Sequence, residues 1–255
     1  MITVCILAKN SQRSLFNTLA SLRRFNEIVL LDTGSTDQTI AIAQTFPNIV
    51  VRQTSFSGFG HLRNQAAEIA KHDWILAVDS DEVLSPALEE EILSLTLNPA
   101  CVYEIDFWNY YNGKRILGCG WHPERHIRLY HRRATQFSSV SLHEGIIREK
   151  SIKTIRLKHP IYHTPYRSTY DFISKMQLYS DLFAEQHRGK RTSSFSKALG
   201  HALGALLKSY FLKRGFLMGK EGAIISWYNA NVAFYKYLKL AEANQNHLLT
   251  GAVKR

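Results

Sequence analysis

The stretch WILAVDSDE, residues 74–82, places a short apolar run directly before two aspartates that stand one residue apart. A continuous apolar run is typical of a strand buried on both faces of a parallel sheet. Upstream, apolar runs at 2–7, 28–31 and 49–52 alternate with segments whose apolar residues recur at helical spacing. Strand–helix–strand repetition predicts parallel βαβ units. We therefore expect an α/β fold with a doubly wound, mostly parallel, twisted sheet flanked by helices.

The pattern changes after residue 100. Short strands are expected at 102–108 and 126–130, with a loop or hairpin rich in glycine and aromatic residues between them. The rest of the chain is predicted to be helical in three segments, at 168–187, 195–213 and 221–243. We therefore expect an α/β domain over residues 1–165 and a basic, amphipathic, helical C-terminal region over residues 166–255.

Charge is distributed unevenly along the chain. The 255 residues carry a formal net charge of +11, from 32 Lys and Arg against 21 Asp and Glu. Residues 1–110 hold 7 basic and 13 acidic residues, whereas residues 111–255 hold 25 basic and 8 acidic residues. An acidic first part joined to a strongly basic second part indicates two separate tasks, and a phosphate-rich partner for the second.

Composition excludes several broad classes of protein. A hydrophobic fraction of 45% and a charged fraction of 21% are ordinary for a globular chain and exclude wholesale disorder. The mean hydropathy of −0.19 argues against a membrane-embedded protein. The apolar N-terminus lacks a basic n-region, so we interpret it as a first strand rather than a signal peptide. Cys5, Cys101 and Cys119 have no CxxC spacing and are expected to be reduced thiols of a cytoplasmic protein.

Three carboxylates are expected at the carboxyl ends of strands, where open α/β sheets bind their ligands. Asp32 ends the second apolar run, and Asp79 and Asp81 follow the fourth. Two carboxylates one residue apart on a turn can hold a hard divalent cation and leave positions for diphosphate oxygens. Helix capping and ordinary surface acidity are the alternative interpretation of all three.

A glycine loop at 57–60 leads into a predicted helix that carries Arg63 in its first turn. The N-terminus of a helix and a guanidinium group both favour an anionic or nucleotide ligand. The alternative is an ordinary helix start with a solvated arginine.

Four stretches, taken together and in this order, resemble the inverting family 2 glycosyltransferases of GT-A fold. They are VCILAKN at 4–10, IVLLDTGSTD at 28–37, GFGHLRN at 58–64 and WILAVDSDE at 74–82. Further downstream, RLYHRR at 128–133, LHE at 142–144 and GFL at 215–217 extend the resemblance over nearly the whole chain. They narrow it to a subgroup similar to bacterial lipopolysaccharide core glucosyltransferases. The resemblance implies a Rossmann-like GT-A domain that binds a nucleotide-sugar and carries out catalysis.

The resemblance also implies residues that bind the donor. Ala8 and Asn10 fall in its first motif and are expected at the nucleotide-sugar. Asp32 corresponds to the carboxylate that contacts the uracil base, and Arg63 to a residue close to the nucleotide. Asp79 corresponds to the first aspartate of the family's DxD motif, near the ribose and the metal.

A divalent cation and a catalytic base are implied in the same way. Asp81 corresponds to the second aspartate of the motif, which ligates Mn²⁺ or Mg²⁺ at the diphosphate. His163 is the candidate for a late histidine ligand of that metal, whereas its spacing taken alone favours a structural, hydrogen-bonded role. Glu144 stands where the family keeps its base, and His143 directly before it is the other residue that can take the proton.

The chemistry agrees with these residue types. Displacement of UDP with inversion needs in-line attack by an acceptor hydroxyl, and a carboxylate must take the proton of this poor nucleophile. The leaving diphosphate gains charge that a cation stabilises. We therefore expect transfer of a hexose, with glucose the first choice, from a UDP-sugar to a lipopolysaccharide or lipooligosaccharide core acceptor. Another cell-surface glycan is the alternative acceptor.

The basic C-terminal region suggests where such an enzyme works. Residues 195–213 gather apolar side chains on one helical face, with lysines around it, so the helix can lie in an anionic membrane interface or pack on a core. With a lipid-linked acceptor, we expect a cytoplasmic protein held peripherally on the inner face of the cytoplasmic membrane.

Two other classes fit parts of the sequence. The apolar run followed by DSDEV at 79–83 also fits the signature of haloacid-dehalogenase-type phosphatases, but that motif usually lies on the first strand of the chain. The basic half suggests a nucleic-acid-binding protein, yet no recognised nucleic-acid module is present. We therefore expect no nucleic-acid partner.

Overall fold

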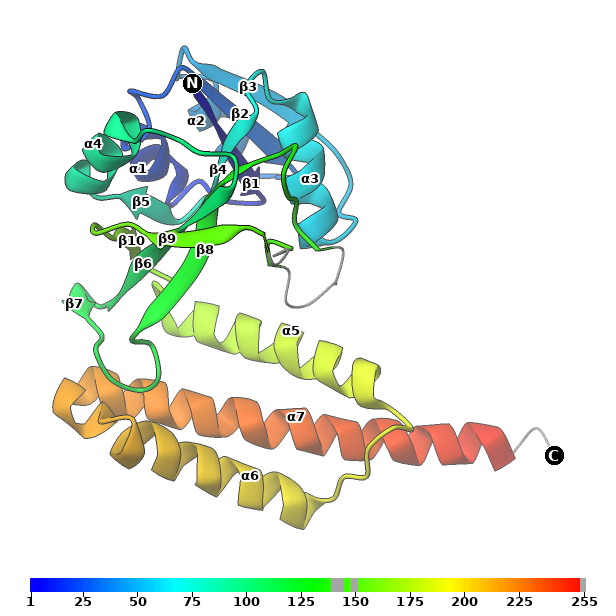
Figure 1. The fold of residues 1–255 in the computed structure, drawn as a ribbon. Coiled ribbons are helices and arrows are strands. Elements are labelled where there is room, and N and C mark those ends of the chain that lie inside the picture. The colour runs from blue at the N-terminus through cyan, green and yellow to red at the C-terminus, as the bar shows by residue number, and fades with distance from the viewer. Residues whose placement is uncertain (139–144, 148–150, 253–255) are drawn as a thin grey trace. The chain divides into compact units, whose positions relative to one another are not determined.

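The computed structural model describes residues 1–138, 145–147 and 151–252 (Figure 1). By its internal contacts the chain divides into two compact units. Unit 1 comprises Met1–Trp108 and Glu124–Thr164, and unit 2 comprises Asn109–Pro123 and Pro165–Arg255. The segment 109–123, which the sequence-based division places in the α/β domain, groups with the C-terminal helices.

Four parallel strands form the first part of the unit 1 sheet. They are β1 (Ile2–Ala8), β2 (Glu27–Asp32), β3 (Ile49–Gln53) and β4 (Trp74–Asp79). β1 pairs in parallel with β2 and β4, and β2 pairs in parallel with β3. Every residue of β2 is buried, as expected for a strand covered on both faces. The register places Ala8 opposite Asp32, and Leu7 opposite Asp79, so the candidate residues share one edge of the sheet.

Helices cover both faces of this sheet. They are α1 (Leu15–Ala20), α2 (Thr39–Ala43), α3 (Phe59–Ile69) and α4 (Pro86–Ser94). α1, α2 and α4 share one hydrophobic cluster with Val4 and Ile6 of β1, and α3 packs on the opposite face with Cys5. Alternate residues of β1 therefore face different helices, which is the period-two alternation of a strand.

The remaining strands of unit 1 make the sheet mixed. They are β5 (Glu82–Leu84), β6 (Cys101–Tyr111), β8 (Glu124–His131), β9 (Lys153–Arg156) and β10 (Ile161–His163). The strand order is β3-β2-β1-β4-β8-β6-β10-β5, with β9 paired to β6. β8 runs antiparallel to both β4 and β6, and β10 runs antiparallel to β5. From β4 onward the sheet is mixed, because β8, the next strand in the order, runs antiparallel to β4.

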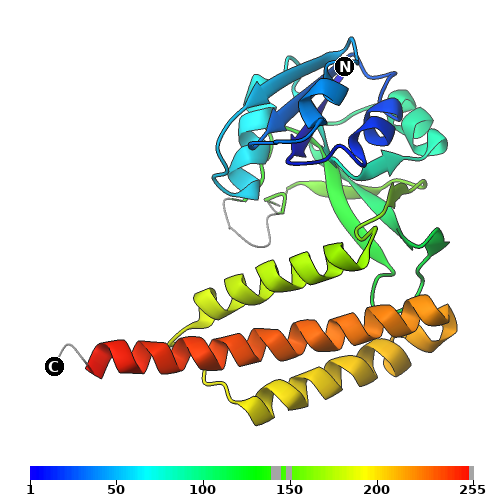
Figure 2. The ribbon, with the colours of Figure 1, turned by 180° about the vertical axis from the view of Figure 1, so that it is seen from behind.

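Unit 2 is helical apart from a short hairpin. β7 (Lys114–Arg115) pairs with the end of β6, and the helices are α5 (Thr169–His187), α6 (Phe195–Leu207) and α7 (Lys220–Ala252). A π-helical turn (Lys208–Leu212) and a 3₁₀ turn (Gly215–Met218) connect α6 to α7. α7 packs along both α5 and α6 (Figure 2). Within the described part of the chain, no helix is both long enough and apolar enough to cross a membrane.

Candidate active site

A tight turn after β2 encloses Asp32. The carboxylate is fully buried and accepts hydrogen bonds from the backbone N–H groups of Gly34, at 3.1 Å, and Ser35, at 3.0 Å, and from the Ser35 hydroxyl. Gly34 has a φ of 96°, a left-handed conformation that favours glycine. The Asp32 carboxylate thus shapes the DTGSTD turn, and the uracil contact that the resemblance implies for it stays a prediction.

Asn10 ties the loop after β1 to the same turn. Its side-chain oxygen accepts a hydrogen bond from the backbone N–H of Thr36, at 2.8 Å, and its own N–H donates to the Ser35 hydroxyl, at 2.9 Å. The carbonyl of Ala8, a buried residue, accepts from the backbone N–H of Thr33 at 2.9 Å. Ala8, Asn10 and Asp32 therefore lie together in one hydrogen-bonded pair of loops.

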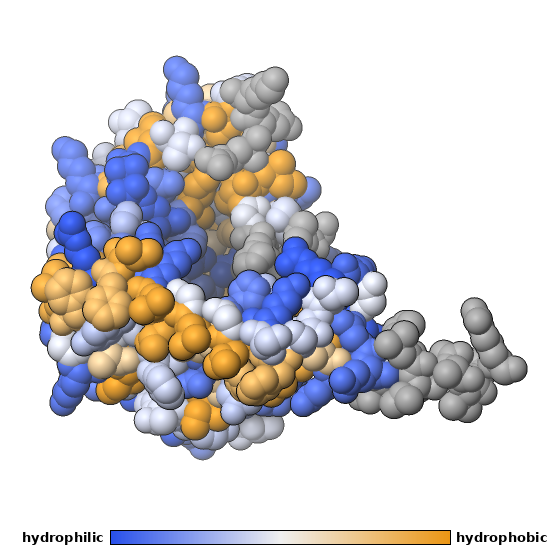
Figure 3. Space-filling view, turned by 90° about the horizontal axis from the view of Figure 1, so that it is seen from below, coloured by the Kyte–Doolittle hydropathy of each residue, from blue (hydrophilic) through white to orange (hydrophobic). Residues whose placement is uncertain are grey.

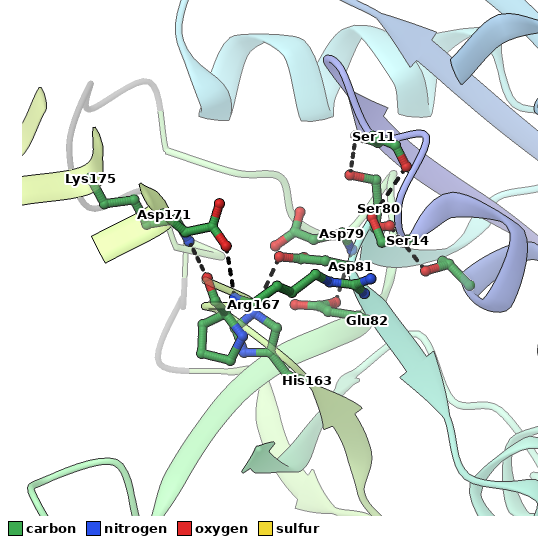
Figure 4. Close-up of polar contacts among 12 residues, drawn as sticks. Ser11, Ser14, Asp79, Ser80, Asp81, Glu82, His163, Arg167, Asp171 and Lys175 are labelled. Carbon is green, nitrogen blue, oxygen red and sulfur yellow. Dashed lines mark hydrogen bonds and ion pairs between the residues drawn. The ribbon is translucent and has the colours of Figure 1, made fainter. Parts of the chain in front are cut away.

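The DSDE segment at the end of β4 is hydrogen-bonded to the loop after β1 and to helix α1. The Ser80 hydroxyl lies 2.7 Å from the Ser11 hydroxyl, and the Ser80 carbonyl accepts a hydrogen bond from Thr18 at 3.1 Å. Figure 4 shows Asp79, Ser80 and Asp81 following one another, with Ser11 beside Ser80. These contacts fix the segment against the β1–α1 loop.

Asp79 is held by two arginines. Its two carboxylate oxygens accept hydrogen bonds from Arg63, at 2.7 Å, and from Arg128, at 3.0 Å. Burial alone would raise the pKa of Asp79, but the two guanidinium groups hold it well below the usual range. Asp79 is therefore ionised, and both its oxygens are engaged by α3 and β8. Arg63, expected close to the nucleotide, is itself buried beneath Asp79.

Glu82, which was not among the residues expected at the site, completes this buried network. It accepts a hydrogen bond from the backbone N–H of Asp79, at 2.8 Å, and forms a short ion pair with Arg128. Burial raises the pKa of Glu82; Arg128 opposes this shift, and the charge of Asp79 adds to it. The position of Glu82 directly after the DxD motif could have indicated a role at the site. Its partner, Arg128, could not be predicted, because it comes from β8, a strand distant in the sequence.

Asp81 and His163 face one another on the accessible side of the segment. The Asp81 Oδ2 lies 3.6 Å from the His163 Nε2, because β10 pairs with β5 and sets His163 opposite Glu82. Burial would lower the pKa of His163, but the hydrogen bond and charge of Asp81 outweigh it, with Glu82 adding to the effect, and raise the pKa. Figure 4 shows both side chains at the same end of the segment.

This pair fits a divalent cation. A carboxylate oxygen and an imidazole nitrogen are ligands that Mn²⁺ accepts, and Mg²⁺ accepts the carboxylate. The part of the chain that the structure describes holds no group of three or more His, Cys, Asp and Glu side chains arranged for a metal. Asp81 and His163 would thus supply two ligands, and diphosphate oxygens and water the others.

A cavity of about 400 Å³ opens beside these residues within unit 1. Its lining includes Asp79, His163 and several charged groups of β6 and β8, namely Glu104, Glu124, Arg125 and His126. The imidazole Nε2 of His126 lies 2.8 Å from Glu124 Oε1. Gly145 also lines the cavity, while Glu144 and His143, the two candidate bases, lie outside the described residues. A cavity lined by carboxylates, imidazoles and the guanidinium groups of Arg63, Arg125 and Arg128 suits a polyhydroxylated ligand.

Comparison with known proteins defines the class. The model of the family "Glycosyl transferase family 2" matches residues 3–156, well over half of the chain. The protein therefore belongs to glycosyltransferase family 2, an enzyme family, and its sheet and helices form the GT-A-like fold expected from the sequence. Because the match spans the whole DSDE segment, it assigns this motif to the glycosyltransferase family and replaces the phosphatase alternative.

Individual relatives cover nearly the whole chain. A protein of Rhizobium meliloti described as "Lipopolysaccharide core biosynthesis glycosyltransferase LpsC" is 29% identical over 96% of this chain and 92% of its own length. An uncharacterized glycosyltransferase of Rickettsia typhi is 26% identical over 96% of this chain and 87% of its own length. Among solved structures, S. aureus TarS in complex with UDP-GlcNAc covers 98% of this chain and 92% of that chain, with 14% identity and a TM-score of 0.47.

Proposed function

We propose that this glycosyltransferase moves a hexose, with glucose the first choice, from a UDP-sugar to a lipopolysaccharide or lipooligosaccharide core acceptor, with inversion at the anomeric carbon. The observation that carries the proposal is the Asp81–His163 pair, 3.6 Å apart, at a cavity lined by the neighbouring Asp79 and by His163 itself. Another cell-surface glycan remains the alternative acceptor.

The donor site follows from the loops at the edge of the sheet. Asn10 and Asp32 shape the loop pair on one side, and Asp79 stands beside it in a fixed, ionised state. Such a rigid, polar edge suits a nucleotide, since hydrogen-bonding groups that are already oriented lose little entropy when the ligand binds. In this scheme the uracil lies toward Asp32 and the diphosphate toward Asp81.

Asp81 and His163 are the residues that would hold Mn²⁺ or Mg²⁺. The cation would screen the charge that develops on the departing diphosphate. Asp81 needs to be ionised and His163 neutral for this role, and Asp79 stays ionised beside them because Arg63 and Arg128 hold its charge. Asp79 is thus the carboxylate that pairs with the arginines, and Asp81 is the carboxylate that would bind the cation.

The acceptor hydroxyl needs a base, and Glu144 is our candidate, with His143 the second choice. The residue after Glu144, Gly145, lines the cavity, which supports placing the reaction there. The charged lining of β8 would hydrogen-bond sugar hydroxyls of the acceptor. The name of the Rhizobium relative supports an acceptor in the lipopolysaccharide core, and a lipid-linked acceptor supports work at the inner face of the cytoplasmic membrane.

Release of UDP tests the proposal without knowledge of the acceptor. Wild type, Asp81→Ala, His163→Ala and the control Glu68→Ala, an exposed carboxylate of α3, are incubated with a panel of UDP-sugars, with and without Mn²⁺. We expect Mn²⁺-dependent release from one sugar, lost in Asp81→Ala, weakened in His163→Ala and retained in the control. Release from no sugar, or release that neither Asp81→Ala nor His163→Ala reduces, would reject the proposed donor and cation site. The anomeric configuration of a transferred product, read by NMR, decides between inversion and retention.

A further inference from the structure

Helix α6 presents its large apolar residues outward instead of packing them. Of its thirteen residues only Ala198 is buried, and Ala202, Ala205 and Leu206 are half-buried. The large apolar residues recur at every fourth position and are 44–63% exposed, namely Phe195, Leu199, Leu203 and Leu207. Residues four apart share one face of a helix. Ala198 and its half-buried neighbours therefore serve the packing of α6, the rings of Phe195 and His201 contact Phe234 and Tyr237 of α7, and the outer face of α6 is apolar.

The exposed apolar residues continue beyond α6. They continue through the π-helical and 3₁₀ turns into the start of α7, in elements that contact one another. We define the apolar ridge as the exposed residues Phe195, Leu199, Leu203, Leu207, Phe211, Leu212, Phe216, Leu217, Ile224 and Trp227. Figure 3 shows apolar side chains in a band across one face of the molecule. A monomeric soluble protein rarely exposes so many large apolar residues in succession, so the ridge indicates a binding surface.

The charge around the apolar ridge identifies its partner. Residues 186–220 contain no Asp or Glu, and their basic residues are Arg188, Lys190, Arg191, Lys197, Lys208, Lys213, Arg214 and Lys220. All eight are exposed. The next acidic residue, Glu221, is buried. The ridge is therefore flanked by positive charge alone, which complements a surface of phosphate groups.

We propose that the apolar ridge lies in the interface of an anionic lipid bilayer, with its apolar side chains among the acyl chains and its basic side chains at the lipid phosphates. Amphipathic segments of this kind lie in the plane of the interface. The long stems of lysine and arginine let the charges reach the headgroups while the ridge is inserted. Trp227, at 62% exposure, has the amphipathic ring that favours the headgroup level.

A second copy of the chain fits the ridge less well. A dimer formed through it would bring two sets of eight positive charges together with no acidic group between them. The proposal supplies a surface for the membrane location in the proposed function and is independent of the donor and cation site, because every residue that it uses lies in unit 2. Binding to lipid can therefore succeed or fail whatever sugar the enzyme transfers.

The test is co-sedimentation of the full-length protein with lipid vesicles. The vesicles contain phosphatidylcholine alone, or phosphatidylcholine and phosphatidylglycerol in a ratio of about 3:1. We expect binding to the second kind, weakened by salt at about 0.5 M. The double variant Leu203→Glu/Leu207→Glu is expected to lose about tenfold or more of this binding, since it places two carboxylates in the inserted face.

A control variant outside the ridge separates the loss of insertion from the general effect of an added negative charge. Leu178→Glu alters a leucine of α5 that has the same exposure as Leu203, 54%, but lies outside the ridge, and it is expected to bind within about twofold of wild type. Circular dichroism confirms that each variant is folded. In the wild type, vesicles with brominated acyl chains should quench the fluorescence of Trp227, and the Trp227→Phe variant should show less quenching.

Three results would overturn the proposal. The first is no binding to anionic vesicles. The second is binding that the double variant leaves unchanged, or that Leu178→Glu weakens equally. The third is a protein that does not bind lipid vesicles but forms a concentration-dependent dimer. Light scattering would detect this dimer, and Leu203→Glu/Leu207→Glu would abolish it.

Discussion

Arg128 on β8 joins two carboxylates of the DSDE segment, with one terminal nitrogen hydrogen-bonded to Asp79 and ion-paired with Glu82. The Arg128 and Glu82 side chains are both buried, so the charge of Arg128 is compensated mainly by the ionised Asp79, while Glu82, whose pKa is raised, accepts a hydrogen bond from it. The position of the DxD motif thus depends on an antiparallel strand that arrives 46 residues later. The conformation of the candidate cation site and the mixed part of the sheet are consequently linked.

Removing the Arg128 guanidinium should destabilise the protein strongly. Arg128→Met leaves Asp79 and Glu82 without their shared partner, and loss of one partner of a buried ion pair costs about 3–5 kcal/mol. We expect a loss of this size in urea denaturation, and a raised KM for the UDP-sugar in whatever fraction stays folded. Arg156→Met is the control, because the exposed Arg156 pairs with Glu104 outside this network, and loss of that pair should cost about 1 kcal/mol or less of stability. Equal effects of the two substitutions would contradict the buried network.

Glu82 predicts an unusual dependence of stability on pH. Its pKa is raised in the folded state, so the folded protein holds this proton more tightly than the unfolded chain does. The resulting stabilisation is complete below the unfolded pKa of about 4.3 and is lost as the pH rises through the folded pKa. Glu82→Gln lacks this contribution. We therefore expect the free energy of unfolding of the wild type to fall relative to the variant as pH rises above about 4.3.

The slope of that difference can reach about 1.4 kcal/mol per pH unit while the folded Glu82 is protonated and the unfolded one is not. Urea denaturation of both proteins over a pH series measures it. The free energy of unfolding of Glu68→Gln, a substitution at an exposed position, should change with pH in the same way as that of the wild type. A wild-type stability that instead rises relative to Glu82→Gln over the same range would mean that Arg128 dominates and that the pKa of Glu82 is lowered.

Loss of His163 should weaken the response to Mn²⁺. We expect the Mn²⁺ concentration that half-activates UDP release to rise about tenfold or more in His163→Ala, since even residues that only support a metal ligand cost 10–100-fold in affinity. His159→Ala is the control, because His159 pairs with Glu91 away from the cavity. An unchanged Mn²⁺ requirement would show that His163 has only the structural role that its contact with Asp81 also permits.

The same histidine should make the Mn²⁺ requirement depend on pH. Protonated imidazole cannot ligate a metal, and Asp81 helps to raise the pKa of His163. The Mn²⁺ concentration for half-activation should therefore rise as the pH falls below that raised pKa. In His163→Ala this part of the pH dependence should disappear, which a Mn²⁺ titration at several pH values checks.

Asp32 offers a test of whether a turn-forming carboxylate also binds nucleotide. Asp32→Asn replaces one carboxylate oxygen with an amide nitrogen, and should cost about 1–3 kcal/mol of stability because the N–H and O–H donors of Gly34 and Ser35 lose part of their shared buried acceptor. If Asp32 also recognises uracil, the KM for the UDP-sugar rises at temperatures where the variant is folded. Ser35→Ala, which removes only the hydroxyl donor to the same carboxylate, serves as the comparison. A folded Asp32→Asn with normal KM would assign Asp32 to the turn alone.

The parallel half of the fold was predictable from local patterns. Continuous apolar runs, each followed by helical periodicity, define β1 to β4, and the position of Asp79 at a strand end follows from them. Helical periodicity around α1 extends over 11–24, yet only Leu15–Ala20 is α-helical. Ser11 and its neighbours are held by other loops: the Ser11 N–H donates to Thr39 and its hydroxyl contacts Ser80. Such contacts override helical propensity and carry no periodic signal.

The antiparallel half was less predictable, because its pairings join distant segments. Nothing in a local window shows that Arg128 reaches Glu82, or that β10 sets His163 beside Asp81. His163 was a candidate through the resemblance alone, and the strand pairing explains its position. For α6, periodicity identified an apolar face without showing that Leu199, Leu203 and Leu207 would stay exposed while Ala198 became buried.

That arrangement of α6 has a practical consequence for handling the protein. A purified sample in buffer without detergent must leave ten large apolar side chains in water, although the mean hydropathy of −0.19 suggests an easily dissolved chain. Average composition hides the difficulty, since the outward placement of Leu203 and Leu207 comes from packing. Purification tags and crystallisation screens should therefore be chosen as for a surface-active protein, with mild detergent or lipid nanodiscs from the first step. Glutamate at the two leucine positions offers a more soluble form for crystallography of unit 1.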